Sequence, residues 1–261
     1  MSSGIEGTRI LILGGSSGIG LGVAKTVLSA GCQDLVISSK NEDKLENAAA
    51  QLRTLCPAAT LSTYSCDLAN GDTLEDNVLK MFSDLESTSE GRKFHHIVFA
   101  AGDPVVLTPL KDRTVNSMIQ SGMVRFFAPI VVAKHASGYM HSGPKCSIVF
   151  TGGVVAQFPA PGWTFHSSYF AGLEGATRSL AVELKPLRVN LVSPGPVLTD
   201  AWENVPPDMR HVLENIVMPK CATGQMANTA ETAEAYLYLM RNTAATGSVV
   251  RTDSGVSIMP G

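Results

Sequence analysis

The chain has 261 residues, of which 44% are hydrophobic and 16% are charged. This length and hydrophobic content are enough to form the buried core of one large domain. Its net charge is −3 and its pI is about 6.1, which excludes a basic surface for nucleic acid or an anionic membrane. Five cysteines occur without a C-x-x-C pair, which argues against a zinc site and a disulfide framework. We therefore expect a cytoplasmic protein that binds no metal.

The N-terminal segment carries no sign of a secretion signal. It runs into only four strongly apolar residues, 10–13, which is too short for the apolar part of a signal peptide. We also expect no segment that spans a bilayer.

Short apolar runs alternate with longer segments of helical length. The expected strands are 9–13, 34–38, 60–66, 95–100, 146–151, 187–193 and 247–252. The expected helices are 20–30, 41–54, 73–86, 121–140, 167–184 and 231–240. Runs rich in valine and isoleucine without strict alternation suit strands buried on both faces of a parallel sheet. The pattern predicts one α/β domain over residues 1–261, a Rossmann-like doubly wound parallel sheet of about seven strands.

A glycine-rich turn, LGGSSGIG, follows the first expected strand and opens the first expected helix. Glycine permits a tight turn and close approach to a phosphate, while the helix N-terminus offers free N–H groups and a positive dipole. Glycine turns after strands are common, but here strand, turn and helix all agree. We predict that this turn binds a dinucleotide through Gly14, Ser16, Ser17, Gly18, Ile19 and Gly20.

The spacing Gly-x-x-x-Gly-x-Gly resembles that of the short-chain dehydrogenase/reductase family, and further segments extend the resemblance over nearly the whole chain. SCDLAN and FAAG resemble two of its nucleotide-binding segments, and RVNLVSPGPVLTD resembles the segment that holds the nicotinamide. The resemblance implies an oxidoreductase with a nicotinamide cofactor. It assigns cofactor contacts to Asp67, Leu68, Ala101, Gly102, Pro194, Gly195, Val197 and Thr199.

The end of the second expected strand bears on the choice of cofactor. Sites that prefer NAD place a carboxylate there to accept a hydrogen bond from the ribose 2′-OH. This chain has Ser39 at that position, followed by Lys40. A hydroxyl and an ammonium attract a 2′-phosphate, which a carboxylate would repel. The pair predicts NADP(H), although Lys40 could also be an ordinary surface lysine.

The family's catalytic residues are replaced in this chain. Alignment on LEGATR places His166 at the family's tyrosine, Phe170 at its lysine, Gly153 at its serine and Arg125 at its asparagine. Tyrosine needs a nearby cation to exchange protons near neutral pH, whereas histidine does not. His166 is therefore a candidate for proton transfer. The alternative is a polar residue at a helix start, in a site that has lost proton transfer.

Arg125 is a second catalytic candidate, because it interrupts an otherwise apolar helix face, MVRFFAPIVVAKHA. A buried guanidinium is costly unless it meets an anion, a carbonyl or a phosphate, so a functional role competes with a structural salt bridge. Tyr169 shares a helix face with His166 and is a candidate pocket residue. Thr151 could replace the missing serine hydroxyl, and Trp163 could stack on a substrate or seal its loop.

These departures resemble a group of fungal family members in natural-product pathways, which carry an arginine in RF-x-A-P and a Pro-x-Pro-Gly-Trp loop. Some members reduce imine-like or iminium-like intermediates, and some also promote a cyclisation. In the cyclising members we associate an aspartate with the second loop position, where this chain has Ala160. The resemblance implies an NADP(H)-dependent reductase of an activated C=N or C=O in a bulky apolar intermediate.

Residues 194–227 form an insertion before the last expected helix. Its apolar residues could pack on the sheet or form a lid over a hydrophobic small-molecule substrate; they are Trp202, Met209, Val212, Leu213, Ile216 and Val217. The alternative function is a non-redox cyclase or isomerase that keeps NADP(H) as a remnant or as part of the pocket. A binding protein on the same fold is a third hypothesis. The family resemblance further implies a homodimer or homotetramer, paired through the helices 121–140 and 167–184.

Overall fold

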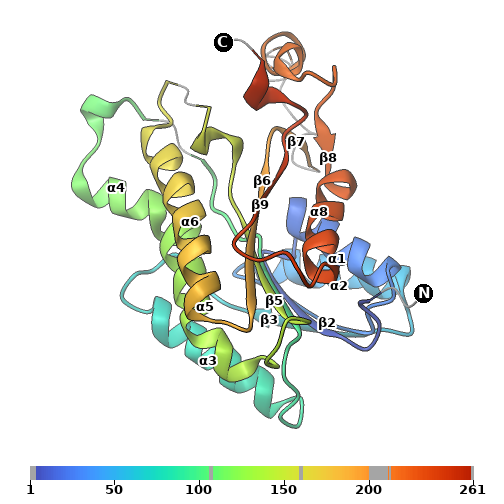
Figure 1. Ribbon diagram of the computed structural model, residues 1–261. Coiled ribbons are helices and arrows are strands. Elements are labelled where there is room, and N and C mark those ends of the chain that lie inside the picture. Colours follow the sequence, from blue (N-terminus) through green and yellow to red (C-terminus); the bar gives the residue numbers. More distant parts are fainter. Residues whose placement is uncertain (1–3, 106–107, 159–160, 200–210, 212, 260–261) are drawn as a thin grey trace.

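The computed structural model describes residues 4–105, 108–158, 161–199, 211 and 213–259 (Figure 1). The expectations for Ala160, Trp202, Met209 and Val212 lie outside the described residues, as do those for the side chains of Leu213 and Ile216.

Seven parallel strands form the central sheet, in the order β3-β2-β1-β4-β5-β6-β9. Their bounds are β1 Arg9–Leu13, β2 Asp34–Ser39, β3 Thr60–Ser65, β4 His96–Phe99, β5 Ser147–Thr151, β6 Arg188–Pro194 and β9 Val249–Thr252. The strand order reverses between β1 and β4, so the connections that leave these two strands diverge to opposite faces. The predicted doubly wound parallel sheet is confirmed.

Helices cover both faces of the sheet (Figure 1). One face carries α1 (Gly18–Ser29), α2 (Glu42–Leu55) and α8 (Thr229–Arg241), and the other carries α3 (Leu74–Ser87), α5 (Ala128–Tyr139) and α6 (Thr164–Glu183). Alternate residues of each strand enter opposite cores: Ile10 and Ile12 face α1, while Leu11 and Leu13 face α3. Burial on both faces explains why these strands read as continuous apolar runs.

The helix expected over 121–140 is longer and less regular than the sequence suggests. It consists of α4 (Val115–Gly122), a π-helical turn η2 (Met123–Phe127) and α5, without a break. Such turns are rare and occur frequently at functional sites. Arg125 lies within this turn.

The continuous helix Val115–Tyr139 has 25 residues and a mean hydropathy of 1.2 in its apolar window, so by length and composition alone it could cross a bilayer. Its buried residues, among them Val132 and Ala136, pack in the core on the α3 face. Ile119 and Phe127 remain exposed. The expected pairing of two chains through this helix and α6 stays a prediction.

The insertion at 194–227 is joined at its two ends. Strand β7 (Val197–Leu198) pairs with β8 (Ala227–Asn228) in a small separate sheet. Between them, Val217 and Met218 pack in a third apolar cluster, together with Val154, Phe158, Cys221, Met226 and Val256. This cluster is separate from the two cores of the main sheet.

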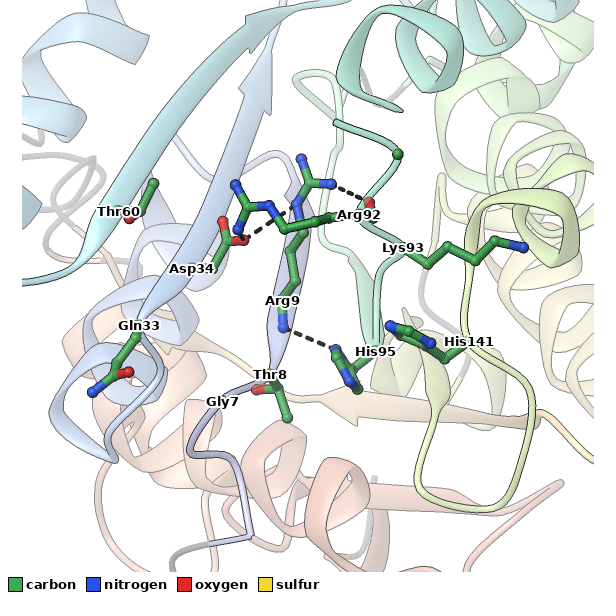
Figure 2. A pocket seen from close by; sticks show the side chains of 11 residues that line it. Gly7, Thr8, Arg9, Gln33, Asp34, Thr60, Arg92, Lys93, His95 and His141 are labelled. Atoms are coloured by element: carbon green, nitrogen blue, oxygen red, sulfur yellow. Dashed lines mark hydrogen bonds and ion pairs between the residues drawn. The ribbon is translucent and has the colours of Figure 1, made fainter. Parts of the chain in front are cut away.

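A cavity of about 590 Å³ lies at the amino-terminal edge of the sheet, where β1, β2, β3 and β4 begin (Figure 2). Parallel α/β sheets bind ligands at the opposite edge, beyond the carboxyl ends of their strands. The cavity is lined by Gly7, Thr8, Arg9, Gln33, Asp34, Thr60, Gly91, Arg92, Lys93, His95 and His141.

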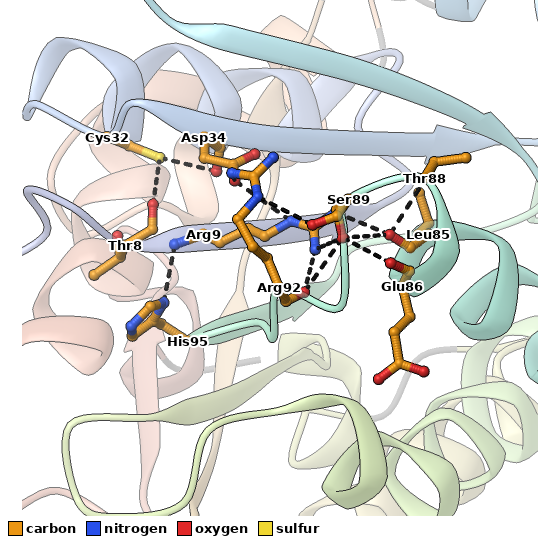
Figure 3. A network of polar contacts seen from close by, with 10 residues as sticks. All are labelled: Thr8, Arg9, Cys32, Asp34, Leu85, Glu86, Thr88, Ser89, Arg92 and His95. Atoms are coloured by element: carbon orange, nitrogen blue, oxygen red, sulfur yellow. Dashed lines mark hydrogen bonds and ion pairs between the residues drawn. The ribbon is translucent and has the colours of Figure 1, made fainter.

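Arg9 forms the centre of a buried polar network beside this cavity (Figure 3). Its Nη1 donates to Ser89 Oγ at 2.5 Å, and its Nη2 donates to Leu85 O at 3.2 Å. Its Nε lies 3.5 Å from Asp34 Oδ2, and its guanidinium lies 4.4 Å from the centre of the Phe94 ring. The side chain therefore joins β1 to β2 and to the end of α3.

We predict that Arg9→Met lowers the free energy of unfolding by about 3 kcal/mol or more, because Asp34 and the carbonyl of Leu85 lose a buried partner. Arg53→Met is the control, since its ion pair with Glu46 is exposed and should contribute less than about 1 kcal/mol. Urea denaturation of both variants measures the difference. Equal effects would contradict a structural role for the Arg9 network.

Candidate active site

The glycine-rich turn packs tightly against the end of β4. Gly14 has a φ of +82°, and a Cβ built there would lie 2.4 Å from Ala101 N. A Cβ on Gly20 would lie 2.1 Å from Gly14 O. Neither position tolerates a side chain without displacing backbone, so the turn needs glycine at both. The close packing sets the carboxyl end of β1 beside the carboxyl end of β4.

The N-terminus of α1 follows directly from this turn. Ser17 occupies the N-cap position in an extended conformation, but its side chain makes no capping hydrogen bond. The first N–H groups of a helix have no partner within the helix, so an uncapped start can bind an anion such as a phosphate. This arrangement, together with the room left by Gly14 and Gly20, fits the pyrophosphate of a dinucleotide.

Most of the other predicted cofactor residues lie along the same edge. Thr199 Cγ2 would lie 3.5 Å from a Cβ on Gly18, so the segment after β6 returns to the start of α1. Gly195 lies against the backbone of Asp253, with 2.7 Å between a built Cβ and Asp253 Cα. Pro194 ends β6, Val197 is buried in β7, and Ser16 and Ile19 are half-buried in the glycine turn.

The residues predicted to hold the adenosine half differ in exposure. Ser39 ends β2 and is half-buried, while Lys40 is exposed. Asp67 is exposed and accepts a hydrogen bond from the N–H of Ala69 at 3.0 Å. Leu68, by contrast, is buried in the core on the α3 face, where its side chain anchors the segment that carries Asp67. Their cofactor roles stay predictions.

Arg125 extends from the π-helical turn to the end of β4. Its Nη2 donates to the carbonyl oxygen of Asp103, and its Nε lies 3.3 Å from Asp103 Oδ1 as an ion pair without hydrogen-bond alignment. The guanidinium packs against Gly102, where a Cβ would lie 2.9 Å from Arg125 Cζ. It also lies 5.9 Å from the centre of the Phe170 ring. Burial lowers the pKa of Arg125 and Asp103 raises it, but the guanidinium stays charged.

His166 lies in the first turn of α6 and is buried. Its ring meets Trp163 edge to face at 5.5 Å, and its Nδ1 has no hydrogen-bond partner among the described residues. Burial lowers the pKa of His166, Arg125 and Arg113 lower it further, and Asp103 opposes them. The imidazole is therefore neutral at pH 7, with one nitrogen as donor and the other as acceptor.

The positions that the family resemblance singles out come together in space. A Cβ on Gly153 would lie 3.0 Å from Phe170 Cε2, and Phe170 in turn lies beneath Arg125. His166 is close enough to Arg125 for the guanidinium to shift its pKa. This group, which we call the Arg125 cluster, consists of Asp103, Arg125, Gly153, His166 and Phe170. It combines one fixed cation, one carboxylate and one neutral imidazole.

The hydroxyls of Tyr169 and Thr151 do not join the Arg125 cluster. Tyr169 donates to Met118 O at 3.0 Å, and its ring packs 5.3 Å from that of Phe126, so it fixes α6 to the helix that carries Arg125. Although it is only three residues from His166, its position on α6 turns it toward η2.

Thr151 points to the other face of the sheet. Its Oγ1 donates to Phe99 O at 2.8 Å and accepts from Tyr236 Oη at 2.6 Å. Successive residues of a strand face opposite sides, and Thr151 shares the α8 side with Val149. The hydroxyl that we expected to replace the missing serine is therefore engaged away from α6.

Asp103, the partner of Arg125, was not among the residues predicted from the sequence. A carboxylate directly after Gly102, just beyond a central strand, was the available signal. Arg113 was not predicted either; it lowers the pKa of His166 and lies over the Phe165 ring at 5.7 Å. Among the described residues, no three His, Cys, Asp or Glu side chains gather as a metal site.

Comparisons with known proteins agree with this architecture. A family model of the SDR-like Rossmann domain matches residues 2–259. The short-chain dehydrogenase/reductase fsr5 of Gibberella fujikuroi is 37% identical over 259 residues, which cover 97% of this chain and 96% of the relative. The short-chain dehydrogenase/reductase malC of Malbranchea aurantiaca is 38% identical over 255 residues, covering 97% and 95%.

A solved structure extends the likeness to three dimensions. The MalC reductase/Diels-Alderase from Malbranchea aurantiaca matches with a TM-score of 0.92 at 37% identity, over 99% of both chains. The family match and these relatives each span nearly the whole chain. The chain therefore belongs to the short-chain dehydrogenase/reductase family of oxidoreductases.

Proposed function

We propose that this protein is an NADP(H)-dependent reductase of an activated C=N or C=O bond in a bulky, apolar natural-product intermediate. The observation that carries the proposal is the Arg125 cluster: a charged guanidinium and a neutral imidazole lie at the carboxyl edge of the sheet, where the family places its chemistry. Family membership and the relative described as a reductase/Diels-Alderase support the same class of reaction.

The residues that would hold the cofactor lie along that edge. Gly14, Gly18 and Gly20 with the start of α1 would bind the pyrophosphate, and Ser39 with Lys40 would bind the 2′-phosphate. The segment after β6 would hold the nicotinamide. When bound, NADPH supplies the hydride, and the protein contributes orientation and electrostatics.

The charges of the cluster favour a substrate that is already activated. A ketone develops negative charge on its oxygen as hydride arrives and needs a proton donor. His166 is neutral at pH 7 and is thus a weak acid, and Phe170 offers no cation in place of the family's lysine. A C=N⁺ group needs no protonation before it accepts a hydride. The cluster therefore suits an iminium better than an unactivated ketone.

Arg125 and His166 would then orient the substrate. Arg125 Nη1 makes no hydrogen bond within the described part of the chain, so it can donate to a substrate carbonyl. The unpartnered Nδ1 of His166 offers a second polar contact. Since Tyr169 and Thr151 are bonded within the protein, we place them in supporting roles.

Apolar surroundings support a bulky substrate. Phe170 and Trp163 border the cluster. The third apolar cluster joins the described part of the insertion, through Val217 and Met218, to Val154 and Phe158 in the connection between β5 and α6. This contact between the insertion and the β5–α6 connection supports a role for the insertion as a lid.

The second candidate function is a non-redox cyclase or isomerase on the same fold. It is favoured by the loss of the family's tyrosine and lysine, and by the relative that is described as both a reductase and a Diels-Alderase. In that case the protein would bind NADP(H) as part of the pocket without oxidising it.

We predict that Lys40→Asp weakens NADPH binding at least tenfold, about 1.4 kcal/mol, and leaves NADH binding nearly unchanged. The change replaces an exposed ammonium at the end of β2 by a carboxylate that repels the 2′-phosphate. Tryptophan fluorescence titrations with each nucleotide measure it. Lys44→Asp, on the exposed side of α2, is the matched control. An equal loss of both nucleotides would refute the assignment, and no binding of either would refute NADP(H) dependence.

We predict that reduction of 2-methyl-3,4-dihydroisoquinolinium slows as the pH falls through a pKa below about 6.5. Because the pKa of His166 is lowered, its imidazole is neutral above that range; protonation below it adds a cation beside Arg125. Steady-state rates between pH 5 and 8 measure this acidic limb of the pH–rate profile. In His166→Ala the acidic limb should disappear, and the rate should be at least tenfold lower. His141→Ala, at the opposite edge, should keep it. A limb that persists in His166→Ala would exclude His166 as its source.

A further inference from the structure

We propose that Asp103 is a specificity-determining residue that makes this site select cationic substrates, an inference that rests on the proposed reductase function. Asp103 follows Gly102 in the segment after β4, forms an ion pair with Arg125 and acts electrostatically on His166. In this way the structure assigns to one aspartate the recognition of a positively charged substrate group, such as an iminium or a protonated amine.

The charges around the cluster require a counter-charge for such a substrate. Arg125 carries a permanent positive charge, and Arg113 lies close enough to lower the pKa of His166 as well. Two guanidinium groups alone would repel an iminium. Asp103 supplies negative charge beside Arg125 and His166, because its carboxylate acts to raise the pKa of both groups.

The Asp103 carboxylate is still able to bind a substrate group. Its Oδ1 lies 3.3 Å from Arg125 Nε, in an ion pair without hydrogen-bond alignment. Its Oδ2 accepts no hydrogen bond from any described residue, and the side chain keeps 29% of its surface exposed. The carboxylate is therefore partly buried, where charge is screened less than in water, yet it can still be reached by a ligand.

The backbone of Asp103 also contacts Arg125, so the charge of its side chain can be changed without removing this contact. Arg125 Nη2 is held by the backbone carbonyl of Asp103, which no substitution of the side chain removes. Asp103→Asn keeps this anchor and nearly the same shape, and deletes only the negative charge. The variant therefore tests electrostatic selection with the guanidinium still tethered.

The test compares a cation with its neutral carbon isostere: 2-methyl-3,4-dihydroisoquinolinium and 3-methyl-1,2-dihydronaphthalene. Binding of each is measured by ligand-observed NMR, with and without saturating NADP⁺, so that no turnover is needed. We expect the wild-type protein to bind the cation at least tenfold more tightly. In Asp103→Asn the affinity for the cation should fall at least tenfold, while that for the isostere changes less than threefold. Asp112→Asn, an exposed aspartate in the turn Leu110–Asp112, should behave as wild type.

Two outcomes would overturn the proposal. Equal losses for both probes in Asp103→Asn would show that Asp103 only supports the fold of the site. A wild-type protein without preference for the cation would show that no such selection exists. Failure of the proposed reductase would look different: the preference for the cation and its dependence on Asp103 would persist, while no hydride reached the bound cation from NADPH.

Discussion

The close packing of the turn after β1 on the end of β4 is the constraint on which the site depends. Gly14 and Ala101 approach so closely that a Cβ on Gly14 would lie 2.4 Å from the neighbouring backbone nitrogen. Because β1 and β4 are adjacent in the sheet while their connections diverge, this contact sets the start of α1 beside the segment that continues from β4. Gly102 and Asp103 follow at once, and the backbone carbonyl of Asp103 holds Arg125. The glycine-rich turn and the Arg125 cluster are thereby built on one close backbone contact.

Burial gives the Arg125 cluster its chemical character. A guanidinium keeps its charge in such surroundings, whereas an imidazole loses its proton, so burial leaves Arg125 charged and His166 neutral. The family's tyrosine and lysine would have offered a proton donor and a cation on the same helix. This chain offers instead a fixed cation from the π-helical turn and a carboxylate from the end of β4. In the proposed function, these charges would hold and orient a charged group rather than donate a proton.

The sheet and its glycine turn were predictable because their signals are local. Each strand is a short apolar run buried on both faces, and the turn combines glycines, a strand and a helix within a dozen residues. Arg125 was also predictable as a buried cation, because it interrupts an apolar helix face.

The partners of these residues were not predictable, because they are set by tertiary packing. Asp103 is 22 residues from Arg125 in sequence, and the guanidinium that reaches it comes from the π-helical turn. The orientation of the Thr151 hydroxyl was not predicted for a simpler reason. The alternation of side chains along β5 turns this hydroxyl toward Tyr236, 85 residues away. Tyr169 shares its helix with His166 but is drawn into packing with Phe126.

Isotope transfer can show whether the Arg125 cluster supports hydride transfer from NADPH to an activated C=N⁺ group. A single turnover with NADPH deuterated at both C4 positions and 2-methyl-3,4-dihydroisoquinolinium, followed by mass spectrometry of the product, follows the hydride itself. We expect a tetrahydroisoquinoline that carries one deuterium for each NADPH oxidised. A bound cation that remains unreduced while NADPH is unchanged would contradict it and would place the non-redox cyclase or isomerase first.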